Sequence, residues 1–214
     1  FLEFEGRIGY VQVEMSSREN QLLVTLEGVP LRQYRSVLSR VKSLFDADHN
    51  PAHLPASVPR KSRGTRAPGS FDPFEVAVSI ILSQLVSTVQ AKNNLKTLIE
   101  QYGRKIGLHD GREVFVFPVA SDLRDAPLET MGLTRVKAGA IRELSRRIDD
   151  GAISFDSHLD FATMRGMLRA VRGIGPWTCE LIAMRCCGDP DAFPRGDLLV
   201  RKTLEQKPER EVQW

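Results

Sequence analysis

Cysteine is scarce in this sequence of 214 residues, which contains only Cys179, Cys186 and Cys187. Three cysteines, two of them adjacent, are too few and too close together for a disulfide framework or a four-cysteine metal cluster. Long apolar runs are also missing, so the sequence predicts no membrane-spanning helix, and no signal peptide is recognisable. These absences favour folding in a reducing, intracellular compartment. We therefore expect a cytoplasmic protein without membrane contact.

Charge of one sign is not in large excess, because 30 Lys and Arg residues face 27 Asp and Glu residues and leave a net charge of +3. One segment departs from this balance. Residues 53–71 contain Arg60, Lys61, Arg63 and Arg66 and no acidic residue. A solvated linker and a loop that contacts phosphate both fit this composition, and the sequence leaves the two alternatives open.

The first sixty residues carry the pattern of a sheet followed by a helix. Residues 4–14 and 21–26 are rich in β-favouring residues and predict a hairpin, with its turn at residues 18–20. Residues 31–45 predict an amphipathic helix. The apolar face expected to pack on the core consists of Leu31, Tyr34, Leu38, Val41 and Phe45.

Helices dominate the rest of the sequence. Asp72 is a typical N-cap residue and Pro73 suits the first helical position, so a helix is predicted to begin here. The run that follows, as far as Leu82, is apolar on every side, which is typical of a helix in the middle of a bundle. The sequence thus predicts an α+β fold, with a small sheet-and-helix domain over residues 1–60 and an all-helical bundle over residues 61–214.

The segment between residues 168 and 199 is the most informative part of the sequence. A predicted helix over residues 164–171 ends near Gly173, and Pro176 suits the first turn of a second helix. Backbone that lies between two glycines can fold tightly and present N–H groups to an anion such as phosphate. An ordinary turn between helices would use the same residues. The predicted unit is helix, hairpin, helix, with its hairpin at Gly173, Ile174 and Gly175.

Asp197 stands immediately before another predicted helix, at residues 198–202. Most aspartates in this place are helix caps and nothing more. This one also follows a loop rich in turn residues, Asp189 to Gly196, which could hold it rigidly beside the hairpin. The helix N-terminus favours the ionised carboxylate, so we expect Asp197 to be negative at neutral pH.

Three blocks of the sequence, in this order, resemble the helix–hairpin–helix base-excision DNA glycosylases of the AlkA type, the 3-methyladenine DNA glycosylases II. They are residues 66–103, residues 131–144, and GIGPWT with its Pro/Asp loop and the GD pair before a helix. The resemblance covers nearly the whole chain. It implies a monofunctional DNA glycosylase that flips alkylated purines, of the 3-methyladenine and 7-methylguanine type, out of duplex DNA. Hydrolysis of the N-glycosidic bond would leave an abasic site for base-excision repair.

The resemblance also implies roles for individual residues. Asp197 would be the catalytic carboxylate that stabilises an oxocarbenium-like sugar. Trp177 would be an aromatic wall of the base pocket, against the alternative of a core tryptophan. Leu85, together with Gln84, would enter the duplex in place of the flipped nucleotide, against the alternative of a core leucine. The three hairpin residues and Thr178 would bind DNA phosphate.

The implied partner is double-stranded DNA with a damaged base, bound by a monomer in the cytoplasm of a bacterium, at the nucleoid. No metal or other cofactor is implied, apart from a monovalent cation bridging hairpin carbonyls to phosphate. In bifunctional members a lysine stands where this sequence has Trp177, which favours a monofunctional hydrolase. By the same resemblance the N-terminal domain lacks its opening portion, and the family continues beyond Trp214.

Three other classes of protein stay open at this point. The first is a non-catalytic helix–hairpin–helix module, which clamps DNA without needing a carboxylate at Asp197. A second is a glycosylase for oxidised or deaminated bases, which Trp177 disfavours. The third is a helical protein with no role on DNA.

Overall fold

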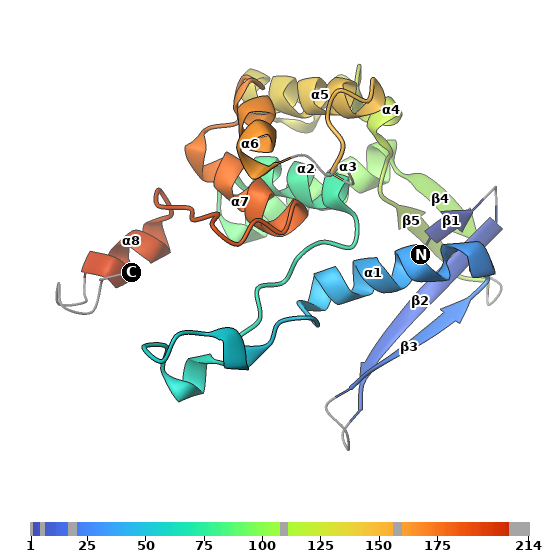
Figure 1. The fold of residues 1–214 in the computed structure, drawn as a ribbon. Helices are drawn as coiled ribbons and strands as arrows, with labels where there is room; N and C mark the ends of the chain where they lie inside the picture. The colour runs from blue at the N-terminus through green and yellow to red at the C-terminus, as the bar shows by residue number, and fades with distance from the viewer. Residues whose placement is uncertain (1, 5–6, 17–20, 108–110, 156–159, 206–214) are drawn as a thin grey trace. The chain divides into compact units, whose positions relative to one another are not determined.

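The computed structural model describes residues 2–4, 7–16, 21–107, 111–155 and 160–205, and the chain divides into two compact units, residues 1–71 and 72–214. Three antiparallel strands open the first unit, in the order β1 (Leu2–Phe4), β2 (Arg7–Met15) and β3 (Leu22–Glu27) (Figure 1). The strands of the predicted hairpin are thereby confirmed, and Val13 lies opposite Val24 in their register. The turn predicted at residues 18–20 lies outside the described residues.

The helix predicted over residues 31–45 begins later and presents a different face. A 3-10 turn (Leu31–Gln33) precedes α1 (Tyr34–Phe45). The side chains of Leu31, Leu38 and Phe45 are exposed, whereas Val37 and Val41 are buried. The prediction of the core-facing stripe was therefore wrong at three positions. With the first helical residue at Tyr34, the buried side chains at steps of three and four fall on a neighbouring face of the helix.

The basic segment 53–71 belongs to the first unit, so the division lies eleven residues beyond the predicted boundary at residue 60. Two of its arginines are hydrogen-bonded to backbone carbonyls of the first unit. The Arg63 guanidinium donates to the carbonyl of Pro55 at 2.9 Å, and Arg66 donates to the carbonyls of Asp46 and His49 at 2.8 and 2.7 Å. These hydrogen bonds satisfy loop carbonyls, so Arg63 and Arg66 act within the fold in this structure. Short 3-10 turns (Pro51–His53 and Arg60–Ser62) complete the loop.

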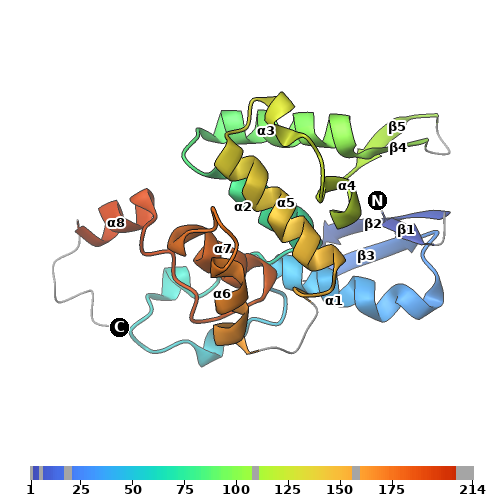
Figure 2. The same cartoon turned by 90° about the horizontal axis from the view of Figure 1, so that it is seen from above.

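The second unit consists mainly of helices (Figure 2). They are α2 (Pro73–Ser83), α3 (Thr88–Tyr102), α4 (Ala120–Leu123), α5 (Arg135–Asp149), α6 (Phe161–Arg169), α7 (Pro176–Cys186) and α8 (Leu198–Glu205), with a 3-10 turn (Leu128–Met131). None of the helices in the described ranges has the length and apolarity needed to cross a membrane.

Helix α2 is the centre of this unit, as its apolar sequence predicts. It packs against α3, α5 and α7, and Ala77, Val78, Ile81 and Leu82 are completely buried. The predicted helix start is confirmed, because the Asp72 side chain accepts hydrogen bonds from the N–H groups of Phe74 and Glu75. Because these four apolar side chains are buried together, they hold the C-terminal end of α2 in place, and the next loop begins there.

One part of the bundle is not helical, which corrects the prediction of an all-helical region. Strands β4 (Arg104–Gly107) and β5 (Glu113–Val116) form an antiparallel pair after α3. Ile106 is buried and lies opposite Val114. The β-favouring run Val114, Phe115 and Val116 is the local signal for this pair, although each strand is only four residues long. The α+β class is unaffected by the correction.

Candidate active site

The predicted hairpin between α6 and α7 is present, and its two glycines are required for different reasons. Gly173 has a φ of +99°, and a Cβ added there would lie 3.0 Å from the Ala140 Cβ and 3.1 Å from the Val136 carbonyl oxygen of α5. Gly173 thus permits both the left-handed turn and the close approach of α5. Gly175 has an ordinary φ of −80° at the N-cap of α7, and a Cβ added there would meet nothing within 4 Å. Space therefore remains open in front of Gly175.

Ile174 lies between these glycines and points inward. Its side chain is buried in the core, and its N–H donates to the Val171 carbonyl at 3.0 Å. This N–H is already used within the hairpin, so it is not available to an anion in this structure. The N-terminus of α7 has no side-chain cap, because Gly175 occupies that position. Backbone N–H groups of the first turn of a helix are the ones that such a cap would otherwise satisfy.

Gln84 joins the end of α2 to the hairpin. Its Nε2 donates to the Gly173 carbonyl at 2.9 Å and to the Thr178 hydroxyl at 2.8 Å. Thr178 is almost completely buried, with 2% of its surface exposed. The structure thus places Gln84 and Thr178 against each other beneath the hairpin, with their polar groups engaged. Their geometry connects the hairpin to the loop that follows α2.

Leu85 protrudes from that loop. Its side chain is fully exposed, and its φ of 53° lies in the left-handed region, which is uncommon for a residue other than glycine. Such a conformation costs about 1–2 kcal/mol and persists only where surrounding contacts impose it. An exposed leucine on strained backbone contradicts the core alternative for Leu85. It marks a side chain held out from the surface.

Lys137 supports the loop that follows α2, a role that the sequence did not indicate. Its side chain enters from α5, where Lys137 is 9% exposed, and its ammonium group donates to the Leu82 carbonyl at 3.2 Å. Burial lowers the pKa of Lys137 below its ordinary value. The ammonium group satisfies a carbonyl at the C-terminus of α2, where positive charge is favoured. Only its inward position on an amphipathic helix could have suggested this role.

Asp197 and Trp177 form a direct pair. The Trp177 Nε1–H donates to Asp197 Oδ2 at 3.0 Å, while Asp197 Oδ1 accepts from the N–H groups of Leu199 and Val200 at 2.9 and 3.2 Å. The hydrogen bond from Trp177, with those from the two backbone N–H groups, lowers the pKa of Asp197, although partial burial opposes the shift. The aspartate is therefore a helix cap through one oxygen and a partner of Trp177 through the other.

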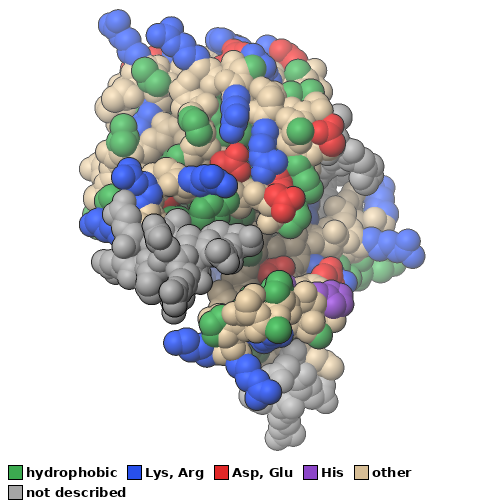
Figure 3. Space-filling view, turned by 60° about the vertical axis from the view of Figure 1, so that its left-hand side comes forward, with side chains coloured by type: hydrophobic (Ala, Val, Ile, Leu, Met, Phe, Trp, Pro, Cys, Tyr) green, Lys and Arg blue, Asp and Glu red, His purple; other side chains and the backbone are tan. Residues whose placement is uncertain are grey.

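Two cavities lie in this part of the second unit, and Trp177 lines one of them. One, of about 400 Å³, lies beside Trp177 and is also lined by Phe193, Arg165 and Glu180. The other, of about 470 Å³, lies next to the hairpin and is lined by Arg135, Val136 and Arg172, among others. On the face drawn in Figure 3, Lys and Arg side chains are spread over the surface with apolar side chains between them. Arg135 and Arg172 thus place positive charge at the cavity next to the hairpin.

The cysteines and the other metal-binding side chains form no cluster in the described ranges. Burial raises the pKa of the Cys187 thiol to about 11 and raises the pKa of the Cys179 thiol as well. Both side chains are therefore protonated thiols at neutral pH, and they act as small apolar groups in the core.

Comparison with known proteins agrees with this geometry. The chain is 32% identical over 179 residues to the Mycobacterium tuberculosis protein named "Probable bifunctional transcriptional activator/DNA repair enzyme AlkA", covering 79% of this chain and 36% of that one. It is 29% identical over 171 residues to DNA-3-methyladenine glycosylase 2 of Escherichia coli, covering 77% of this chain and 60% of that one. No family profile matches the chain.

The fold is that of a solved 3-methyladenine DNA-glycosylase from Archaeoglobus fulgidus, with a TM-score of 0.74 at 20% identity, over 99% of this chain and 75% of that one. Helices, hairpin and sequence together define a helix–hairpin–helix glycosylase fold. Within that class the chain is similar to the AlkA-type 3-methyladenine DNA glycosylases. It spans about a third of the length of the mycobacterial relative and three fifths of the E. coli enzyme.

Proposed function

We propose that this chain is the catalytic region of a monofunctional DNA glycosylase that removes alkylated purines from duplex DNA. The observation that carries the proposal is the Trp177–Asp197 pair, which puts an ionised carboxylate and an aromatic ring together at the helix that follows the hairpin. A DNA clamp without catalysis needs neither group.

Binding begins at the hairpin. The N–H groups of the uncapped first turn of α7, together with the open backbone at Gly175, would hold a phosphate of the damaged strand, with a monovalent cation at the hairpin carbonyls. Arg135 and Arg172 line the neighbouring cavity and add positive charge. Contacts of this kind fix position without reading sequence. We expect one monomer to act on one lesion in double-stranded DNA.

Leu85 would then fill the gap that the flipped nucleotide leaves. The base cannot react while it is stacked, and unstacking costs roughly a few kcal/mol. The side chain of Leu85 is fully exposed and the backbone is held by Gln84 and Lys137 behind it. In this proposal Gln84 supports the wedge and contacts the hairpin, and the expectation that it also enters the duplex stays a prediction.

Cleavage of the glycosidic bond follows in the pocket. The C1′–N bond breaks with its electron pair leaving on the base nitrogen, and Asp197 stabilises the positive charge that develops on the sugar. Water then bonds to C1′, and its proton passes to the carboxylate or to solvent. An N3- or N7-alkylated purine is already cationic and leaves without a protein acid, and the Trp177 ring attracts this cation. Both products, the free base and the abasic site, are accounted for.

No amine stands ready to form a Schiff base at the hairpin, where Trp177 occupies the relevant position. Lys137 instead donates to the Leu82 carbonyl from a buried position. This arrangement supports hydrolysis without strand cleavage.

The test is a base-release assay on methylated duplex DNA with the wild-type protein and Asp197→Asn. We expect the wild type to release 3-methyladenine and the variant to release none, with binding to abasic DNA retained, because charge at the sugar is needed only in the transition state. Borohydride added during turnover should trap no protein–DNA adduct. Release at the wild-type rate by Asp197→Asn would remove Asp197 from the mechanism, and a trapped adduct would overturn the monofunctional assignment.

A further inference from the structure

The loop that carries Asp197 runs back along α7 and is attached to it at three points. The Asp189 N–H donates to the Ala183 carbonyl at 3.1 Å, the Phe193 N–H donates to Glu180 Oε2 at 3.2 Å, and Trp177 donates to Asp197 as described. The three residues of α7 in these contacts are three positions apart, so they follow one side of the helix. Figure 1 shows this connection returning beside α7 toward α8. The middle attachment is a side chain with no assigned function, Glu180.

Glu180 is itself held by a partly buried ion network. Arg165 of α6 contacts Glu180 Oε1 through Nε at 3.3 Å and reaches Asp189 Oδ2 through Nη2 at 2.7 Å. The Asp189 side chain is completely buried, and 16% of the Glu180 side chain is exposed. Arg169 adds a more exposed contact to Glu180 at 3.5 Å. Two carboxylates and two guanidinium groups balance, which is the condition under which buried charge is tolerated.

We propose that Glu180 is a positioning residue for Asp197, because it holds the Phe193 N–H and, through Arg165, the start of the loop, so that the carboxylate stays against Trp177 Nε1. This inference rests on the proposed function, since Asp197 is the carboxylate assigned to the glycosidic bond. Loss of Glu180 leaves the Phe193 N–H without this acceptor and releases the loop between its two ends. A displacement of about 1 Å at a reacting group costs on the order of a hundredfold in rate.

The ionisation of Asp197 reports its position independently of catalysis. The groups that act on its carboxylate are Trp177 Nε1–H from α7 and the N–H groups of Leu199 and Val200 from α8. Its charged neighbours along the chain are Arg195 and Arg201. When the loop moves away from α7, the Trp177 hydrogen bond is lost and the pKa of Asp197 rises. The titration midpoint of the Trp177 indole N–H resonance, which reports the ionisation of Asp197, then moves to higher pH.

The experiment compares Glu180→Ala, Glu180→Gln and the wild type by the pH titration of the Trp177 indole N–H resonance and by single-turnover base release. We expect Glu180→Ala to move the titration midpoint upward and to slow release by about tenfold to a hundredfold, with DNA affinity changed less than about twofold, since the loop makes no assigned phosphate contact. Glu180→Gln keeps an acceptor for the Phe193 N–H, and we expect it to restore most of the rate. Glu113→Gln, which breaks the exposed ion pair of Glu113 with Lys105 between β5 and β4, is the matched control and should leave both readouts unchanged.

A wild-type midpoint together with a wild-type rate in folded Glu180→Ala would overturn the positioning role. Should that variant not fold, Glu180→Asp keeps the charge and withdraws the carboxylate from the Phe193 N–H by one methylene, and the same two changes are expected. Failure of the wild type to release any base would contradict the proposed function alone, because the titration midpoint still decides whether Glu180 positions Asp197.

Discussion

The indole N–H of Trp177 lies 3.0 Å from Oδ2 of Asp197 and favours the ionised form of that carboxylate. Trp177→Phe keeps an aromatic face and removes this donor. The pKa of Asp197 should then rise, so at a given acidic pH more of the carboxylate is protonated and inactive. We expect the acid limb of the pH–rate profile for base release to move to higher pH. At neutral pH Asp197 is ionised in both proteins, and the rate should fall by no more than about tenfold, or about 1.4 kcal/mol in the barrier.

Profiles measured in parallel for the wild type, Trp177→Phe and Trp177→Ala would separate the two roles of the ring. Trp177→Ala should show the same displaced acid limb and a much lower plateau, because it also removes the surface against which a cationic base stacks. An acid limb that stays in place in Trp177→Phe would show that the hydrogen bond does not control the active carboxylate.

The exposed side chain of Leu85 leads to a second prediction. Leu85→Ala should slow excision of a lesion paired in duplex DNA, yet have little effect on a mismatched or unpaired lesion. Only a paired lesion has to leave an intact base stack, which the side chain of residue 85 then holds open. Thermal stability should hardly change, since the side chain buries nothing. Excision rates on matched and mismatched substrates decide the matter, and equal losses on both would rule out a wedge.

The same position offers an internal control on stability. The left-handed φ of Leu85 is strained for leucine, whereas glycine adopts it freely. Leu85→Gly should therefore raise the free energy of unfolding by about 1 kcal/mol. It should also slow excision as Leu85→Ala does. Urea denaturation of both variants measures this difference. A destabilised Leu85→Gly would mean that the strain at residue 85 is not relieved by glycine.

Local signals in the sequence predicted much of this site. Asp72 and Asp197 are N-cap residues and Pro176 begins a helix, and each such signal depends only on residues within one turn. The left-handed conformation of Gly173 belongs to the same class of short-range information. The starts of α2 and α7, the hairpin and the place of the candidate carboxylate before α8 could therefore be predicted without a structure.

Contacts between distant residues could not be predicted in this way. Gln84 and the Gly173 carbonyl are 89 positions apart, and Lys137 and the Leu82 carbonyl are 55 positions apart. A polar side chain on an amphipathic helix looks the same in sequence whether it meets water or a buried carbonyl. Likewise, the arginines at 63 and 66 could not be assigned to loop carbonyls before the path of the loop was known. Tertiary partners, rather than local propensity, decide these roles.

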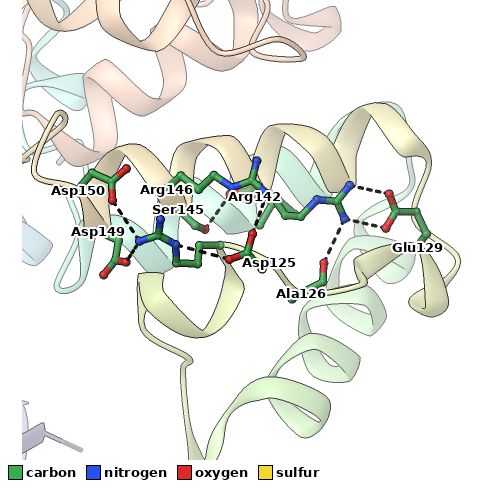
Figure 4. Close-up of polar contacts among 10 residues, drawn as sticks. Asp125, Ala126, Glu129, Arg142, Ser145, Arg146, Asp149 and Asp150 are labelled. Carbon is green, nitrogen blue, oxygen red and sulfur yellow. Dashed lines mark hydrogen bonds and ion pairs between the residues drawn. The ribbon is translucent and has the colours of Figure 1, made fainter.

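Helix α5 must keep its place because it packs against Gly173, and an ion pair on its outer side contributes to this. Arg142 donates to both oxygens of Glu129 at 2.7 Å (Figure 4). These hydrogen bonds lower the pKa of Glu129 from 4.5 to about 2. A carboxylate whose pKa is lower in the folded state stabilises that state above its ordinary pKa, and this stabilisation is lost as the pH falls through the folded value.

Arg142→Gln should therefore be less stable than the wild type at neutral pH, and the difference should shrink as the pH falls from about 4.5 to about 2. Urea denaturation over this range measures it. Arg146→Gln is the comparison variant, since Arg146 pairs with the more exposed Asp125. A pH-independent difference for Arg142→Gln would show that the charge of Glu129 is not involved.

Substitution by alanine should lower the stability of the protein at Gly173 but not at Gly175. Gly173→Ala combines a φ of +99° with contacts of 3.0 and 3.1 Å to α5, so we expect a loss of about 1–3 kcal/mol in the free energy of unfolding. Gly175→Ala has an ordinary φ of −80° and meets nothing within 4 Å, and its stability should stay within about 0.5 kcal/mol of the wild type.

Gly175→Ala should nevertheless weaken binding to DNA of every sequence by a similar factor, because its methyl group would stand where the phosphate approaches the backbone. Urea denaturation and affinities for several unrelated duplexes, measured on the two variants side by side, separate folding from binding. Unchanged affinity in Gly175→Ala would exclude close phosphate contact at this glycine. A loss confined to one DNA sequence would mean that the hairpin reads bases, which backbone contacts to phosphate cannot do.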